Sequence, residues 1–403
     1  MRLTLFSISI LVPTVVLFTF LYFNVPDESV AQSQANPFTE QRVTSAALDF
    51  PSTNVLAAVG VNRIEPADLP AATIVPLPTD PATRALSIVV HTETKKYVTF
   101  GDHRVRSDVV EIRLSQFPKP EQDNGRGLHW FPTTAQKRQV IDRFVPELVA
   151  MKVRWLLILQ GLEDWNLTAN DYLVDKLNAA GIILVMRLEM KVGQEDLARV
   201  SRVVAHYRAK GVRYFQIFNE PNVREEWAHN KEPTPEEFMR HWIPLAEIVA
   251  QHGGLPGLAP LMTSANRADE IFLEKEYQVL LRERRYDLIN IMWLAIHNYG
   301  GMDDKGFLKY RNYARISKFY FRQTIPMIAT EGGMGDAHSS AETVVSAFDA
   351  MKFREPWFLT YCPWLIGNAV GGGHDDTWES QAWFQRNGPL PIVNRVKELP
   401  SQE

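Results

Sequence analysis

From about residue 125 onward, short runs of apolar residues alternate with segments in which apolar residues recur every three or four positions. Successive positions within the short runs are apolar, which is typical of parallel strands that helices bury on both faces. The pattern predicts eight such strands, at residues 128–131, 153–159, 181–188, 214–219, 257–262, 289–297, 327–330 and 358–365.

The intervening segments have the periodicity of helices with one buried face. The apolar positions of three such faces are Val140, Ile141, Phe144, Val145, Leu148 and Val149, then Val200, Val203, Val204 and Tyr207, then Val344, Val345, Phe348 and Met351. Gly181 and Gly211 stand where two helices should end before the next strand, and Thr234-Pro235 is a typical helix start.

Eight strand–helix units over residues 124–398 predict an α/β fold, a (β/α)8 TIM barrel, whose usual size is about 250 residues. A doubly wound open sheet is the alternative. It would normally have fewer strands and a glycine-rich phosphate turn after the first strand, and the sequence shows neither. The barrel therefore fits the pattern better.

Three further segments precede the predicted barrel. Residues 85–123 contain short apolar runs at 86–92, 95–100 and 108–114 around the turn Gly101-Asp102, which predict a few strands packed on the barrel. Residues 24–84 are rich in Pro, Ala, Thr, Gln and Ser without a sustained period, which is typical of a semi-extended tether.

The first 23 residues form a signal peptide or a membrane anchor. Leu3 to Phe23 is almost unbroken apolar sequence after Arg2, and its length suits a spanning helix of about 20 residues. Cleaved signals usually have a shorter apolar region, although Ser29-Val30-Ala31 offers a small-x-small cleavage site. Both alternatives place the rest of the chain outside the cytoplasm, either anchored to the membrane or secreted.

Composition removes several classes of function. The net charge of −4 over 403 residues provides no basic field for nucleic acid. Cys362 is the single cysteine, so a disulfide within the chain and a Cys-based zinc site are both excluded. No phosphate loop or His-rich metal motif stands out, and we expect neither a metal nor an organic cofactor.

Two carboxylates stand at the ends of buried strands. The run FQIFNEPN, residues 215–222, turns abruptly from an apolar strand to Asn219 and Glu220, and PMIATEGG, residues 326–333, places Glu331 at the end of another strand. A carboxylate at the mouth of a buried strand is costly unless it has a task. Cleavage of a glycosidic bond needs such a pair, one to protonate the leaving oxygen and one to attack or stabilise the sugar cation.

Other polar and aromatic residues fall at the same end of the predicted barrel, where TIM-barrel active sites lie. The candidates for substrate contact are His129, Trp130, Arg187, Asn219, His297, Tyr299 and Trp364. Glu189 is expected to be an ion-pair partner. For His129 and Arg187 a structural role is as well supported as a functional one.

The set Asn219-Glu220-Pro221, His297-Asn298-Tyr299 and Glu331 resembles the glycoside hydrolases of clan A, the 4/7 superfamily that includes cellulase-like barrels. The resemblance covers about residues 125–398. It implies a retaining mechanism with Glu220 as acid/base and Glu331 as nucleophile. Asn219 would bind the sugar 2-hydroxyl, and Trp364 would form the floor of the sugar subsite.

By the same resemblance, Tyr299 would donate a hydrogen bond to Glu331, and His297 would contact Glu220 or the substrate. Many members of the clan carry an arginine at the end of the second strand, where this chain has Gln160, and Arg187 is the candidate replacement. The strand-3 histidine motif of cellulase-like members is also missing. No subfamily is therefore assigned.

The expected partner is a carbohydrate, a β-linked glucan, mannan, xylan or related oligosaccharide outside the cytoplasm. A transglycosylase on the same site and a carbohydrate-binding barrel without turnover are the alternatives. The first would pass the sugar to another sugar instead of water, and the presence of both glutamates argues against the second. The Gly371–Asp376 segment is predicted to be a loop beside the site.

Overall fold

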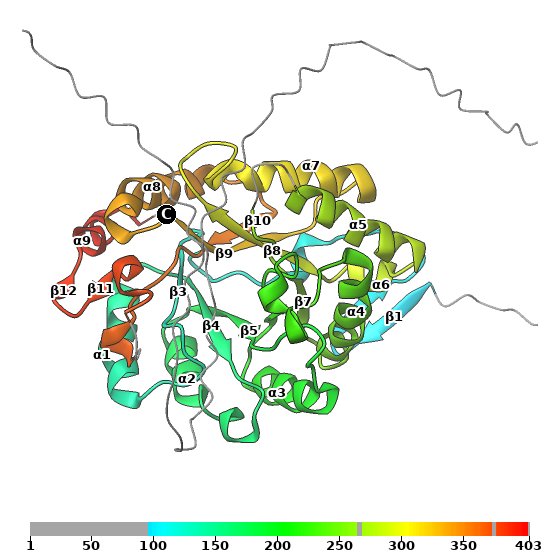
Figure 1. Cartoon of the computed structure of the whole chain (residues 1–403), viewed down its shortest axis with the longest axis horizontal. Coiled ribbons are helices and arrows are strands. Elements are labelled where there is room, and N and C mark those ends of the chain that lie inside the picture. Colours follow the sequence, from blue (N-terminus) through cyan, green and yellow to red (C-terminus); the bar gives the residue numbers. More distant parts are fainter. Residues whose placement is uncertain (1–95, 264–267, 373–375, 402–403) are drawn as a thin grey trace, which may run out of the picture. The chain divides into compact units, whose positions relative to one another are not determined.

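Eight parallel strands form a barrel in the computed structural model of the chain, which describes residues 96–263, 268–372 and 376–401 (Figure 1). They follow one another around the sheet in chain order: β3 Gly127–His129, β4 Trp155–Gln160, β5 Ile183–Leu188, β6 Tyr214–Ile217, β7 Leu255–Leu258, β8 Trp293–Tyr299, β9 Met327–Gly333 and β10 Phe358–Tyr361. A parallel bridge between Arg126 and Tyr361 joins the first strand to the last. The predicted (β/α)8 fold is confirmed.

Helices surround the strands (Figure 1). They are α1 Arg138–Ala150, α2 Asp171–Ala179, α3 Leu197–Ala209, α4 Pro235–Gln251, α5 Ala268–Arg282, α6 Tyr286–Ile289, α7 Tyr310–Phe321, α8 Ala337–Ala350 and α9 Pro391–Glu398. Their apolar faces and the strands make one continuous core. Burial of that apolar area is the main term that stabilises the barrel.

The predicted helix faces are largely confirmed. All four apolar residues named for α3 are buried, as are Ile141, Phe144, Val145 and Leu148 of α1. The prediction for Val149 is wrong, because this side chain is 48% exposed. It follows Leu148 by one position, a rotation of about 100° around a helix of 3.6 residues per turn.

The predicted helix ends also hold. Thr234 caps α4, where its side chain accepts a hydrogen bond from the Glu237 amide, and Pro235 occupies the first turn. Gly181 and Gly211 follow α2 and α3 with φ of 67° and 92°, the left-handed conformation that glycine adopts most readily.

Two predicted strands are displaced along the chain. The run 257–262 is predicted as a strand, but β7 covers Leu255–Leu258 and the chain leaves the sheet after it. The run 289–297 starts too early, because Ile289 ends α6 and β8 begins at Trp293. Residues 289–292 are all buried, and an apolar run alone does not distinguish a buried helix end from a strand.

The segment before the barrel contains one hairpin, β1 Tyr97–Phe100 paired with β2 His103–Arg106. Gly101 makes the turn with φ of 53°, and a Cβ there would lie 2.5 Å from the Gly253 Cα. The strand predicted at 108–114 is wrong. Its amides bond to side chains instead, Glu111 to Asn290 Oδ1 at 2.6 Å and Ile112 to Gln323 Oε1 at 2.7 Å.

This segment packs at the end of the barrel where the strands begin. Asp102 accepts a hydrogen bond from Arg213, which precedes β6, and the amides of 111 and 112 reach residues that precede β8 and β9. Catalytic groups of such barrels lie at the opposite, carboxyl-terminal end. Residues 96–123 therefore stabilise the barrel without reaching the candidate site.

The other predictions for the N-terminal region lie outside the described residues. They concern the apolar segment Leu3 to Phe23, the tether at 24–84 and the strand at 86–92. Within the described part of the chain, no helix combines the length and the hydropathy that crossing a membrane requires.

Candidate active site

Glu220 and Glu331 lie at the carboxyl ends of β6 and β9, as predicted, and are 9% and 7% exposed. After Ile217 the backbone turns out of the sheet through Phe218 and Glu220, whose φ angles are 67° and 29°. Left-handed φ is rare for side chains of this size and concentrates at functional sites. The turn takes Glu220 out of the sheet at the barrel mouth.

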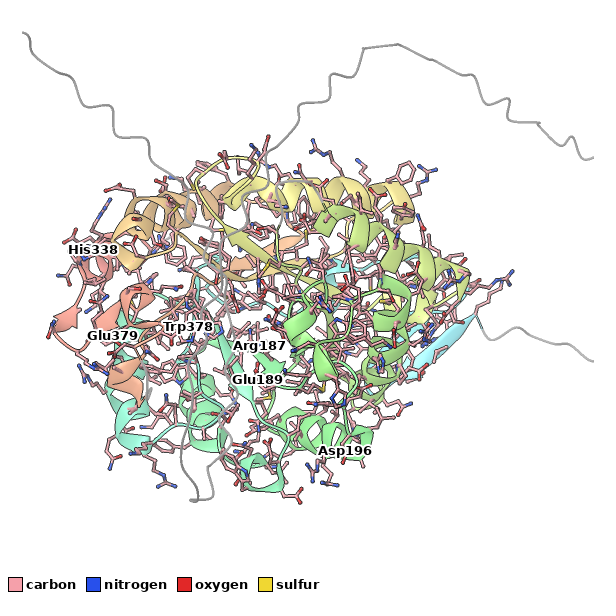
Figure 2. The ribbon with its side chains drawn as sticks, in the orientation of Figure 1. Arg187, Glu189, Asp196, His338, Trp378 and Glu379 are labelled. Carbon is pink, nitrogen blue, oxygen red and sulfur yellow. The ribbon has the colours of Figure 1, made fainter. Side chains whose placement is uncertain are left out.

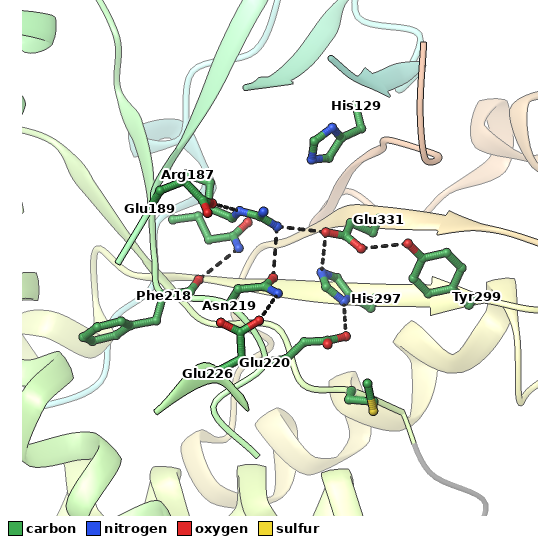
Figure 3. Close-up of polar contacts among 12 residues, drawn as sticks. His129, Arg187, Glu189, Phe218, Asn219, Glu220, Glu226, His297, Tyr299 and Glu331 are labelled. Atoms are coloured by element: carbon green, nitrogen blue, oxygen red, sulfur yellow. Dashed lines mark hydrogen bonds and ion pairs between the residues drawn. The ribbon is translucent and has the colours of Figure 1, made fainter. Parts of the chain in front are cut away.

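His297 lies between the two carboxylates (Figure 3). Its Nδ1 is 2.7 Å from Glu220 Oε1 and its Nε2 is 3.7 Å from Glu331 Oε1. Burial by itself lowers the pKa of His297, but Glu331 and the hydrogen bond to Glu220 outweigh burial and raise it above 6.5. A single imidazole thus bonds to Glu220 through Nδ1 and lies within ion-pair distance of Glu331 through Nε2.

Arg187 at the end of β5 holds Glu331 from the other side. Its Nη1 donates to Glu331 Oε1 at 2.9 Å and to Asn219 Oδ1 at 3.1 Å, and its Nε donates to Glu189. Arg187 is 1% exposed. Burial lowers the pKa of Arg187, but Glu189 and Glu331 outweigh burial, so the guanidinium stays charged.

Tyr299 donates a hydrogen bond of 2.7 Å to the second oxygen of Glu331. Burial and the nearby carboxylate raise the pKa of Tyr299 well above 10, so the phenol keeps the proton that it donates. Burial alone raises the pKa of Glu331. The cations His297 and Arg187, with the Tyr299 hydroxyl, outweigh it and lower that pKa below 4.5. Glu331 is therefore kept as a carboxylate.

Glu226 is a further carboxylate of the site, and the sequence analysis missed it. Its Oε1 accepts a hydrogen bond of 2.9 Å from Asn219 Nδ2. Burial, opposed by this hydrogen bond and reinforced by Glu220, raises the pKa of Glu226 to about 8. In the sequence it stands in Arg224-Glu225-Glu226, which is indistinguishable from a solvated charged turn.

His129 lies above Arg187 and Glu331 (Figure 3). Its Nδ1 is 2.8 Å from the Trp130 carbonyl, which only accepts hydrogen bonds, so Nδ1 carries the proton. Burial lowers the pKa of His129 to about 3, and the ring is neutral. The ring also meets Trp364 edge-on, with centroids 4.2 Å apart.

Trp130 and Trp364 occupy different surroundings. Trp130 is 1% exposed and packs edge-on against Phe131, 4.8 Å between centroids, so its link to the site is the carbonyl that holds His129. Trp364 is 5% exposed and follows β10. Contact of either indole with a substrate stays a prediction.

Two other positions have structural roles. Trp227 is 1% exposed and donates from Nε1 to the Pro221 carbonyl at 2.7 Å, so it fixes the loop that carries Glu220. Gln160, at the end of β4, bonds the Gly161 and Asn166 carbonyls at 2.8 Å. That Arg187, one strand further, replaces the arginine that many clan members carry at the Gln160 position stays a prediction.

The site thus combines one carboxylate fixed in its ionised form with a second that shares a hydrogen bond with a protonatable imidazole. Such a pair suits proton donation coupled to nucleophilic attack. No cluster of three or more His, Cys, Asp or Glu with metal-binding geometry occurs among the described residues.

No family model matches the chain, and no curated protein matches its sequence. Several solved structures with a similar fold are glycoside hydrolases by their descriptions. An endo-β-1,3-glucanase of family GH128, subgroup II, from Sorangium cellulosum has 18% identity and a TM-score of 0.46, with 69% of this chain and 100% of that chain covered.

Two other solved structures with a similar fold come from different glycoside hydrolases. A family 39 glycoside hydrolase from Bacteroides cellulosilyticus has 11% identity and a TM-score of 0.49 over 72% of this chain and 64% of that one. An endo-1,4-β-mannanase from Rhizomucor miehei has 10% identity and a TM-score of 0.44 over 61% and 87%. At these identities the named structures do not assign an activity or a subfamily to this chain.

Proposed function

We propose that this protein is a retaining β-glycoside hydrolase, with Glu220 as acid/base and Glu331 as nucleophile. The observation that carries the proposal is the pair of carboxylates in contrasting surroundings on either side of His297. Glu331 accepts hydrogen bonds from Arg187 and Tyr299, and Glu220 shares one with His297.

In the proposed reaction the Glu331 carboxylate attacks the anomeric carbon while Glu220 gives its proton to the leaving oxygen. The product is a glycosyl ester on Glu331. Glu220, now a carboxylate, takes a proton from water, and that water attacks the anomeric carbon and releases Glu331. His297 steadies the charge on Glu220 as it alternates between its two forms.

Asn219 is the proposed contact for the sugar 2-hydroxyl. Its Oδ1 accepts from Arg187 and one N–H donates to Glu226, which fixes the orientation of the amide. The second N–H is then available for a hydroxyl that bonds more strongly in the transition state. Arg187 and Glu226 thus position Asn219 for catalysis.

The proposed substrate is a β-linked glucan, mannan or xylan, or an oligosaccharide derived from one. The test is a panel of 2-deoxy-2-fluoro β-glycosides incubated with the full-length chain, followed by mass spectrometry of its peptides. The panel includes glucose, mannose and xylose reagents, with β-1,3-glucan and β-1,4-mannan as polymeric substrates. Label on Glu331 is the expected result, and Glu331→Gln should remain unlabelled.

Label on Glu220 would reverse the two roles. A folded protein that takes no label and hydrolyses no member of the panel would overturn the assignment. Transfer of the sugar to an added acceptor sugar, with no release of free sugar to water, would identify a transglycosylase on the same residues.

We propose further that the catalytic barrel acts outside the cytoplasm, anchored by Leu3–Phe23 or secreted after its cleavage. The apolar length of that segment, and Arg2 before it, support this placement. If the barrel is anchored, a protease added to intact cells should degrade it. If the barrel is secreted, it should be recovered from the medium. Full protection inside cells would contradict the proposal.

A further inference from the structure

The loop after β10 places a second tryptophan beside the candidate sugar floor. This loop contains short helical turns at Ala369–Gly371 and Glu379–Gln381 and the strands β11 Phe384–Gln385 and β12 Gly388–Pro389. Trp378, just before the second turn, is partly exposed. In the view of Figure 2 it lies between Glu379 and Arg187.

The two indoles are nearly perpendicular. The ring centroids of Trp364 and Trp378 are 5.3 Å apart with an interplanar angle of 77°. Trp364 is 5% exposed, whereas Trp378 presents more of its surface to solvent. If Trp364 forms the floor of one sugar subsite, the Trp378 ring beside it is placed to form the wall or the floor of the neighbouring subsite.

The loop is tied down on both sides of Trp378. The carboxylate of the adjacent Glu379 accepts hydrogen bonds from the Ala369 amide at 3.0 Å and the Arg386 amide at 2.7 Å. The Glu379 carbonyl accepts from Gln385 Nε2 at 2.9 Å, and Arg386 pairs with Asp376 at 2.7 Å. These bonds hold the Trp378 backbone in place, which reduces the entropy lost when a ligand stacks on its ring.

The position of Trp378 around the barrel indicates which part of a substrate it meets. Trp364 follows β10, whereas Glu220 follows β6, four strands away in a sheet of eight. Four strands of eight is half a turn, so the two residues lie on opposite sides of the barrel mouth. The leaving group must lie beside its proton donor, Glu220. The chain of sugars on the other side of the scissile bond then extends toward Trp364 and Trp378.

We propose that Trp378 is a stacking platform for a second sugar unit, the one that precedes the reacting sugar. The inference rests on the proposed function and deepens it. The C–H face of a pyranose is apolar and stacks on aromatic rings, which is how binding sites use partly exposed indoles. The ligand class is a β-linked oligosaccharide with at least two sugars before the scissile bond.

The test compares 4-nitrophenyl β-glycosides of a monosaccharide and of its disaccharide, with the same leaving group, on the full-length chain. Laminaribiose, cellobiose, mannobiose and xylobiose derivatives are used with the matching monosaccharides. Trp378→Ala should lower the ratio of the disaccharide to the monosaccharide kcat/KM by about tenfold or more. Trp378→Phe, which keeps an aromatic face, should recover part of that ratio.

Phe353→Ala is the matched control. Phe353 is an exposed aromatic residue, 78% exposed, on the turn that precedes β10 at the other end of the barrel. Its loss should leave the ratio at the wild-type value. An unchanged ratio in Trp378→Ala, whether both kcat/KM values fall equally or neither falls, would overturn the inference while leaving the glycosidase assignment intact.

A wild-type chain without turnover is tested by calorimetry with the corresponding hexasaccharides. Binding that Trp378→Ala weakens by about tenfold would support the platform without hydrolysis. Binding that the substitution leaves unchanged would overturn the platform alone. Absence of both turnover and binding would overturn the inference together with the proposed function.

Discussion

Arg187 offers the sharpest test of how the site is held together. This residue is 1% exposed, and its guanidinium bonds to Glu331, Asn219 and Glu189. Substitution by methionine keeps a chain of similar length and removes the charge. Glu331 would then remain buried without its strongest hydrogen-bonding cation, a state that low-dielectric surroundings penalise.

Removal of one partner from a buried ion pair costs about 3–5 kcal/mol, and we expect Arg187→Met to lose this amount at neutral pH. Glu331→Gln should cost less, because an amide oxygen still accepts from Arg187 and the amide nitrogen can donate to Tyr299. In the double variant no unpaired charge remains at position 331. Its loss should be smaller than the sum of the single losses by about 1–3 kcal/mol.

The assay is equilibrium unfolding by guanidinium chloride of the wild type, the two single variants and the double variant, monitored by tryptophan fluorescence and circular dichroism. The pH dependence gives an independent reading. Because the pKa of folded Glu331 is lowered, its contribution to stability is present above about 4.5 and lost as pH falls through the folded value. Without Arg187 that pKa rises, so the deficit of Arg187→Met should shrink as pH falls toward the raised value.

Additive losses within about 0.5 kcal/mol would refute the reasoning, because they would mean that Arg187 and Glu331 do not interact energetically. A stability deficit of Arg187→Met that stays constant with pH would refute the claim that Arg187 lowers the pKa of Glu331. The matched control is Lys176→Met, which removes a 44%-exposed cation that pairs with Asp142. Because that pair lies at the surface, its loss should cost no more than about 1 kcal/mol.

Three other changes test the remaining contacts. Tyr299→Phe removes a hydrogen bond from Glu331, so the acid limb of the pH–activity profile should move upward, and an unchanged limb would contradict this role. The pKa of folded Glu226 is raised to about 8, so the wild type loses stability as pH rises from about 4.5 to about 8, because its folded state must keep a proton that the unfolded state releases. Glu226→Gln has no such proton and should become more stable than the wild type across that range. Melting temperatures measured over the range test this expectation. Trp227→Phe loses the hydrogen bond to the Pro221 carbonyl, and kcat should fall more than the melting temperature predicts, whereas normal kcat would separate this loop from catalysis.

The sequence was sufficient to predict the barrel and the two carboxylates, because both depend on local patterns. Parallel strands buried on both faces give apolar runs, and Glu220 and Glu331 each interrupt one at its carboxyl end. Tyr299 donating to Glu331 and His297 contacting Glu220 were inferred from resemblance and are confirmed by the contacts.

The parts that the sequence missed depend on contacts between distant segments. Residues 108–114 have the composition of a strand, but side chains of Asn290 and Gln323 take up their amides. Glu226 and Trp378 stand in charged or glycine-rich loops without periodicity. Their positions beside Asn219 and Trp364 follow from the tertiary fold.

The junction between the first and last strands has a consequence for how the chain reaches its fold. Gly125 accepts hydrogen bonds from the Tyr361 amide and from the Thr360 hydroxyl, a contact between positions 235 residues apart. During synthesis β3 therefore emerges long before its second neighbour. Until β10 leaves the ribosome, the growing sheet has an unpaired edge, which favours pairing with other chains. Slow translation before Phe358 should prolong that exposure and increase aggregation of the nascent protein.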